Sequence, residues 1–236
     1  MNTVKIDGVS SDTVRLRFDK IPLIPAAKRR TETYNIPGAG EDLTINTPDF
    51  DDIQLTLTAY LVGGTTIQNA YEWIRSGSKL ILSTQPGIYG VIKAVGEITP
   101  TRAGWDAHKI DIPLTLSPFK YRVDNDAVEL DTSPATLETI GNIHSFPTYA
   151  LTGLSGDVSF TVNGTTLTIE NAPATAYIDT DAQTVYKLNG STPESIMSST
   201  TGEFWKMVLC PGNVPNAISW TGTVGGVSVV KNERWV

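Results

Sequence analysis

The residue types that most often carry out chemistry are scarce in this sequence. Cys210 is the single cysteine, and His108 and His144 are the two histidines. A nucleophilic thiol needs a base or a positive charge beside it, whereas Cys210 lies between Leu209 and Pro211 at the end of an apolar stretch. We therefore expect a buried structural cysteine. The histidines have no cysteine or carboxylate at ligand spacing, so a zinc site is not expected.

The carboxylates suggest little more. Asp179 and Asp181 have the spacing of two oxygen ligands for a hard cation such as calcium. Aspartate also favours turns, through side-chain bonds to the backbone, and both interpretations stay open. No spacing singles out the carboxylate pair of a glycosidase, and the phosphate-binding loop and the nucleophile elbow are absent. We expect no enzyme activity, no catalytic residues, no metal site and no cofactor.

Three tryptophans leave a binding function open. Trp205, Trp220 and Trp235 have the residue type that stacks on sugars, although strand alternation favours placing some of them in a core. The alternative function is therefore a carbohydrate-binding β-sandwich module that acts in host-surface recognition. It requires exposed indole rings along one sheet or groove.

Charge and hydropathy exclude other classes. The net charge is −7, which argues against nucleic-acid binding as the main activity, because neutralising phosphates requires a basic surface. No apolar run approaches the roughly 18 residues of a membrane span, and the first residues lack the apolar core of a signal peptide. A single cysteine excludes an internal disulfide. We expect synthesis in a cytoplasm-like compartment and no membrane insertion.

The elements are mostly strands, and the stretch 110–126 organises them. Ile110, Ile112, Leu114 and Leu116 alternate with polar residues, which is typical of a half-buried strand. Pro118 is expected to break this strand, after which the apolar positions change phase. We interpret this stretch as the seam between two β-rich domains, residues 1–123 and 124–236.

The first half is expected to hold strands at 31–36 and 53–61 and one short helix. The helix has an apolar stripe at Ile67, Ala70, Tyr71 and Ile74, preceded by a capping box that begins at Thr65. Residues 80–82 and 88–95 are predicted to form a hairpin, and residues 97–109 a polar loop.

The second half contains short strands separated by turns, which indicates a β-sandwich. The clearest turn is Asn163-Gly164, a type I′ hairpin signal. It predicts that Phe160 pairs with Leu167 and Val158 with Ile169, with both pairs on one face. The fold class expected from the residues is therefore mainly β.

The order and spacing of several stretches resemble siphovirus distal tail (Dit) proteins of the short form, without inserted carbohydrate-binding modules. In the first half the stretches are residues 29–31, 34–38, 71–74, 89, 93–95 and 117–121. In the second half they are residues 142, 146–147, 178–181, 185–186, 211–213, 218–220, 229 and 234–235. Ala39 departs from the pattern, because arginine commonly follows Ile-Pro-Gly in the family.

The resemblance implies an N-terminal β-sandwich-like domain with one short helix, followed by a galectin-like sandwich. It implies a homohexameric ring at the end of a long non-contractile phage tail. The ring joins the tail tube to the tail-tip or baseplate hub proteins, and DNA passes through its channel without sequence-specific binding. The expected location is the virion tail tip, after assembly in the bacterial host cytoplasm, and stacking of the rings on one another stays open.

The basic cluster Lys28, Arg29 and Arg30 has two interpretations. It is either a solvated strand end or a contact with an acidic partner surface. With the resemblance in view, we expect this cluster, together with Tyr34 and Ile36, to lie near a contact between ring subunits.

Overall fold

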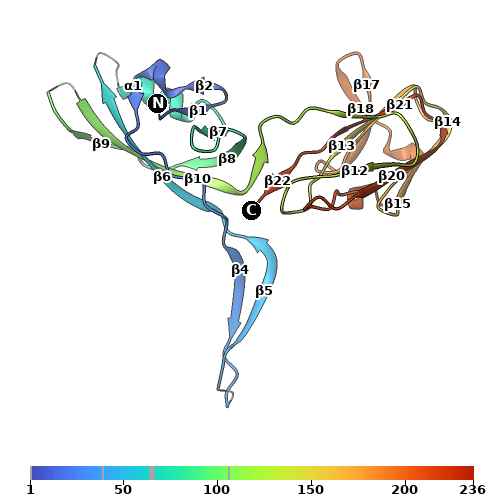
Figure 1. The fold of residues 1–236 in the computed structure, drawn as a ribbon, viewed down its shortest axis with the longest axis horizontal. Coiled ribbons are helices and arrows are strands. Elements are labelled where there is room, and N and C mark those ends of the chain that lie inside the picture. Colours follow the sequence, from blue (N-terminus) through green and yellow to red (C-terminus); the bar gives the residue numbers. More distant parts are fainter. Residues whose placement is uncertain (1, 39, 64–66, 106) are drawn as a thin grey trace. The chain divides into compact units, whose positions relative to one another are not determined.

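The computed structural model describes residues 2–38, 40–63, 67–105 and 107–236 (Figure 1). Its chain divides into two units, residues 1–123 with Val236 and residues 124–235. Strands dominate both units, and the described residues contain one α-helix. The predicted class, mainly β with one short helix, is confirmed. Two sequence features, Ala39 and the capping residue Thr65, lie outside the described residues.

One hydrogen-bonded sheet forms most of the first unit, in the strand order β2-β1-β7-β8-β10-β6-β3, with β9 also paired to β10. Two further strands, β4 and β5, pair only with each other. The bounds are β1 Val4–Ile6, β2 Val9–Ser10, β3 Leu16–Arg17, β4 Arg29–Tyr34, β5 Leu43–Phe50, β6 Ile53–Val62, α1 Ile67–Arg75, β7 Lys79–Leu82, β8 Ile88–Val95, β9 Thr99–Arg102 and β10 Ala107–Arg122.

The strongest alternation in the sequence becomes the centre of this sheet. The odd-numbered residues of β6 and the even-numbered residues 110–116 of β10 are buried in the core, as their period of two predicts. The helix α1 buries Ala70, Trp73 and Ile74, while Ile67 and Tyr71 pack at the core margin. The predicted stripe is therefore confirmed, with Trp73 added to it.

The predicted strand break at Pro118 is wrong. β10 continues without interruption to Arg122, and its even-numbered residues remain buried through Pro118 and Lys120. Proline lacks an N–H group, but β6 stops pairing with β10 at Leu116. The register between β8 and β10 also shifts between Leu116 and Lys120, so Pro118 lies where the ladder is already irregular. The phase of β10 does not change.

Keeping its phase gives β10 an unusual inward residue. Lys120 is only 7% exposed, and its Nζ donates to the carbonyl oxygen of Pro25 at 3.1 Å. Burial lowers the pKa of this amine. Phe119 and Tyr121, which flank it, contact aromatic rings instead: Phe119 meets Phe50, and Tyr121 stacks on Tyr89.

One predicted loop of the first unit contains a strand instead. The hairpin of β7 and β8 forms as predicted. Residues 97–109, however, are not a polar loop. β9 pairs with the beginning of β10, where Arg102 lies opposite His108 and Thr99 lies opposite Asp111. β9 has the sequence TPTR, with no large apolar side chain, so alternation did not reveal it.

The second unit is a sandwich of two sheets, with strand orders β11-β21-β13-β16-β17-β18 and β12-β20-β14-β15-β19. The bounds are β11 Val128–Leu130, β12 Ala135–Leu137, β13 Thr148–Thr152, β14 Ser155–Val162, β15 Thr165–Ile169, β16 Thr175–Asp179, β17 Thr184–Asn189, β18 Thr192–Ser195, β19 Thr200–Thr201, β20 Asn216–Thr223, β21 Gly226–Val230 and β22 Arg234–Trp235.

Aromatic contacts join the two sheets. Tyr149 of β13 meets Phe160 of β14 edge to face, with ring centroids 5.1 Å apart. The Tyr149 hydroxyl donates to the carbonyl oxygen of Met207 at 3.0 Å, and burial raises the pKa of this tyrosine.

The predicted Asn-Gly hairpin is confirmed. Phe160 pairs with Leu167 and Val158 with Ile169, and all four are buried. The turn residues Asn163 and Gly164 have φ values of 49° and 84°. These positive values are what a type I′ turn requires.

Replacing Lys120 with methionine is expected to change how stability depends on pH. The folded pKa of Lys120 lies below its ordinary value. Between these two values the unfolded chain binds more protons, so this group makes the folded state more stable as pH rises. Urea unfolding of wild type and Lys120→Met from pH 7 to pH 10 should show the wild type gaining relative to the variant. Parallel pH profiles would contradict the assignment, and exposed Lys5→Met is the control.

Candidate functional site

The β4–β5 hairpin of the first unit exposes nearly all of its side chains. Every residue of β4 is exposed, and so is β5 apart from Thr47 and Phe50, which are partly buried. Neither strand pairs with another strand among the described residues. An isolated two-stranded hairpin is marginal in water, so this element needs support from outside its own sheet.

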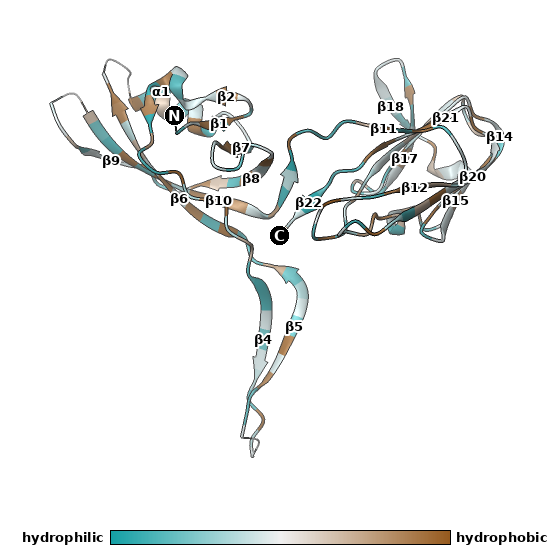
Figure 2. Cartoon of the chain, viewed as in Figure 1, coloured by the Kyte–Doolittle hydropathy of each residue, from teal (hydrophilic) through white to brown (hydrophobic). Residues whose placement is uncertain are grey.

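The hairpin has one apolar and one polar face. Tyr34 lies opposite Leu43, and the next facing pair on the same side is Glu32 and Ile45. Tyr34, Leu43 and Ile45 are 50%, 48% and 45% exposed, and we call these three residues the apolar face. The other side carries Thr31, Thr33, Thr44 and Asn46, the polar face. Figure 2 shows hydrophobic positions on β5 in brown.

One carboxylate lies on the apolar side. The Tyr34 hydroxyl donates to Glu32 Oε2 at 2.5 Å, and this bond raises the pKa of Tyr34. The bond occupies one carboxylate oxygen and leaves the negative charge of Glu32 beside three apolar side chains.

The base of the hairpin is braced by arginines. Arg29 Nε donates to the carbonyl oxygen of Thr47 at 2.9 Å, and its guanidinium lies 6.0 Å from the ring centroid of Phe50. Arg30 pairs with Asp51 at 3.0 Å, a bond that raises the pKa of Arg30. The ring of Phe50 meets Phe119 of β10, centroid to centroid 5.9 Å. The contact of Phe50 with Phe119 therefore connects the base of the hairpin to β10 of the main sheet.

The structure places all five predicted contact residues at this hairpin. Arg29, Arg30 and Tyr34 belong to β4, while Lys28 precedes it and Ile36 follows it. Ile36 is 46% exposed. The two arginines, however, contact their own chain.

Sequence reasoning missed the other half of the apolar face. Leu43 and Ile45 belong to β5, which was not expected. Their alternation with Thr44 and Asn46 was the available signal.

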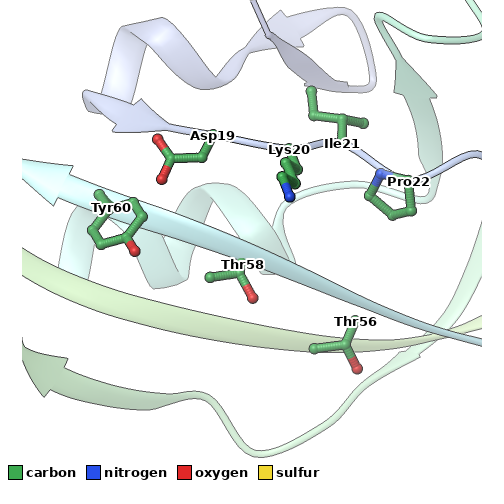
Figure 3. Close-up of a pocket in the computed structure, with 7 residues that line it drawn as sticks. All are labelled: Asp19, Lys20, Ile21, Pro22, Thr56, Thr58 and Tyr60. Atoms are coloured by element: carbon green, nitrogen blue, oxygen red, sulfur yellow. The ribbon is translucent and has the colours of Figure 1, made fainter.

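A hollow of about 590 Å³ lies beside β6 (Figure 3). It is lined by Asp19, Lys20, Ile21, Pro22, Thr56, Thr58 and Tyr60. Thr56, Thr58 and Tyr60 are outward-facing residues of β6, whose alternate residues form the core. Thr58 Oγ1 donates to Asp111 Oδ1 at 2.6 Å, which lowers the pKa of Asp111. The volume lies in the range of roughly 300–1,000 Å³ that is usual for binding sites.

Comparison with known proteins identifies the fold. No protein-family model and no curated protein matches this sequence. A solved structure superposes with a TM-score of 0.70 over 100% of both chains, at 15% sequence identity. It is the Dit (gp 19.1) protein of phage SPP1, described as a paradigm of the hub adsorption apparatus in phages that infect Gram-positive bacteria. The chain has the Dit fold.

The remaining polar candidates, Asp179 and Cys210, form hydrogen bonds within the second unit. Asp179 Oδ1 accepts from the backbone N–H groups of Asp181 and Ala182, which is the turn role. In the described residues, no three His, Cys, Asp or Glu side chains are grouped so that they could hold a metal ion. Cys210 is partly buried, so the expected full burial is wrong. Its backbone N–H donates to Asn216 Oδ1 at 2.7 Å.

The tryptophans do not share one environment. Trp220 is partly buried and packs against the sandwich core, whereas Trp205 is 40% exposed and meets Phe204 edge to face. The expectation that some of the tryptophans pack in a core therefore holds for Trp220 and does not extend to Trp205. Among the described residues, no helix is both long enough and apolar enough to cross a membrane.

Reversing the charge of Arg30 is expected to loosen the hairpin base. Arg30→Glu places a second carboxylate beside Asp51, while Arg30→Glu with Asp51→Arg restores the pair. Hydrogen exchange across residues 29–50 should be a few-fold faster in the single variant and near wild type in the double variant. The control is Lys187→Glu, which breaks the Lys187–Glu194 pair in the second unit. Equal exchange in all four proteins would show that the pair does not brace the hairpin.

Proposed function

We propose that this protein is a Dit-type structural component of a long non-contractile phage tail. Six copies form a ring through the first unit, and the ring joins the tail tube to the tail-tip or baseplate hub proteins around a channel for DNA. The second, galectin-like unit projects outward. The protein acts in the virion tail after assembly in the host cytoplasm. Support comes from the Dit fold, shared over the whole chain.

The uncovered hairpin carries this proposal. Its apolar face exposes Tyr34, Leu43 and Ile45 to water in the single chain, and covering apolar area is the main driving force of association. A neighbouring subunit in a ring supplies such a cover. Lys28 and Ile36 at the two ends of β4 then lie at the margins of the same subunit contact.

The second unit is built differently at its edges. The edge strands β11, β12 and β19 have two or three residues, and the edge strand β18 carries Pro193 and Glu194. Short edges with proline and charge resist pairing with another chain. These features support a second unit that stays separate while the first unit assembles.

The two units also differ in net charge. Residues 1–123 contain 14 Lys and Arg against 13 Asp and Glu, whereas residues 124–236 contain 4 against 12. A nearly balanced first unit does not supply the excess positive charge that retains DNA by neutralising phosphates. This distribution supports a channel through which DNA passes freely.

A charge placed on the apolar face is expected to prevent ring assembly. Ile45→Glu buries a carboxylate in the proposed contact, whereas Thr44→Glu, the matched control on the polar face, does not. Light scattering during size-exclusion chromatography should give a mass of about six copies for wild type and Thr44→Glu. Ile45→Glu should raise the dissociation constant at least about tenfold.

Circular dichroism checks that both variants remain folded. A wild-type protein that stays a single chain at every concentration would contradict the ring. Equal assembly of the two variants would remove the apolar face from the contact.

A further inference from the structure

We propose that Asn189 of the second unit is a site of spontaneous deamidation, whereas Asn163, in the same dipeptide, is protected by its hydrogen bonds. Asn-Gly occurs twice in the sequence, at Asn163-Gly164 and at Asn189-Gly190. The first dipeptide joins β14 to β15, and the second lies where β17 turns into β18. The modification concerns the second unit alone and does not depend on the ring.

The reaction needs only the chain and water. The backbone nitrogen of the glycine loses its proton and attacks Cγ of the asparagine, which forms a C–N bond and closes a succinimide ring. The bond from Cγ to Nδ2 breaks, and the side-chain nitrogen takes up a proton and leaves as ammonia. One water molecule then opens the ring at either carbonyl, which gives aspartate or isoaspartate. Glycine favours the attack because it has no side chain to shield its nitrogen.

The two glycines are equally open to this attack. A Cβ atom placed on either Gly164 or Gly190 would meet no atom within 4 Å apart from its chain neighbours. Their φ values are 84° and 64°, which glycine adopts without strain. Asn163 and Asn189 are both exposed as well. Neither the glycine nor the exposure of the asparagine therefore distinguishes the two sites.

Hydrogen bonds hold the side chain of Asn163 at both of its polar atoms. Nδ2 donates to the carbonyl oxygen of Val208 at 3.1 Å and to Asn216 Oδ1 at 2.8 Å. Oδ1 accepts from the backbone N–H of Ala217 at 3.0 Å. Asn216 is fully buried and donates in turn to the carbonyl oxygen of Leu137 at 3.0 Å. Turning Cγ of Asn163 onto the glycine nitrogen would break these bonds.

The side chain of Asn189 has no such restraint. Within the part of the chain that the structure describes, it forms no hydrogen bond. Its backbone pairs with Thr192 across the turn, and all four residues of β18 are exposed. β18 is the last strand of its sheet and pairs only with β17 among the described strands. Segments with few buried contacts open locally at low cost, so Cγ of Asn189 can reach the nitrogen of Gly190.

The isoaspartate product is expected to open a protected strand edge. Isoaspartate routes the main chain through its side chain, which adds one carbon to the backbone before Gly190. The pairs Leu188–Pro193 and Asn189–Thr192 then lose their register. Since β18 covers one edge of β17, its release leaves that edge unpaired and available to another chain. The modification therefore acts on the edge that Pro193 otherwise helps to protect.

Peptide mapping by mass spectrometry compares the two sites within one molecule. The full-length protein is held in mildly alkaline buffer, which favours loss of the glycine proton, and is sampled over time. Circular dichroism confirms that it remains folded. Conversion at Asn189 should be at least about tenfold faster than at Asn163, because the hydrogen bonds of Asn163 must break first.

The unfolded chain is the matched control. The two sites have similar neighbours, Val-Asn-Gly-Thr and Leu-Asn-Gly-Ser. In urea the hydrogen bonds of Asn163 are absent, so the two conversion rates should lie within about threefold of each other. Equal rates in the folded protein would overturn the protection of Asn163. A folded protein in which Asn189 does not convert would overturn the site itself.

Hydrogen exchange tests the effect on the strand edge. Aged wild-type protein, enriched in the product, should exchange faster across residues 184–195 than fresh protein. Asn189→Gln is aged in parallel and should remain unchanged, because glutamine would have to form a larger ring and does so more slowly. Exchange that is unchanged after conversion of Asn189 would overturn the opening of the edge.

Discussion

The first unit depends on β10 keeping one face buried along its whole length. Its even-numbered residues from Ile110 to Leu116 close the core, and β6, β8 and β9 all pair with it. Because the alternation persists past Pro118, Lys120 points inward and Phe119 remains available for Phe50 at the hairpin base. The strand that closes the core therefore also anchors the exposed hairpin.

The two units solve the problem of strand edges in opposite ways. The sandwich of the second unit encloses a core between its sheets and ends in short or charged edge strands. The first unit instead leaves a two-stranded sheet with its apolar side in water and an open edge on β6. Folding encloses the sheets of the second unit around one core, whereas the first unit leaves an apolar hairpin face exposed, and we propose that a neighbouring copy covers it.

Local patterns were enough to predict the elements whose signal lies within one stretch of sequence. The alternation in β6 and β10, the stripe of α1 and the Asn163-Gly164 turn each carry a period or a backbone requirement that one stretch of sequence specifies. The continuation of β10 through Pro118 depended on where β6 and β8 stop pairing with it. These pairings are tertiary contacts, and the residues on either side of Pro118 do not specify them.

The sequence indicated the residues in and next to β4 of the candidate site but not those of β5. Resemblance pointed to Lys28, Arg29, Arg30, Tyr34 and Ile36, and these residues do lie at one exposed hairpin. Leu43 and Ile45 were missed because only these two apolar residues alternate before Thr47 and Pro48, although β5 continues to Phe50. The hollow left no sequence signal, since residues 19–22 and 56–60 become neighbours only through the fold.

The arginines also explain how an exposed hairpin can be useful for association. A flexible hairpin would lose conformational freedom on docking, and that entropy cost would weaken the contact. Arg29 and Arg30 hold the two strands at their base, and Phe50 fixes that base against Phe119. In the proposed ring, these contacts organise the apolar face before it meets a neighbour, so that apolar burial contributes more fully to assembly.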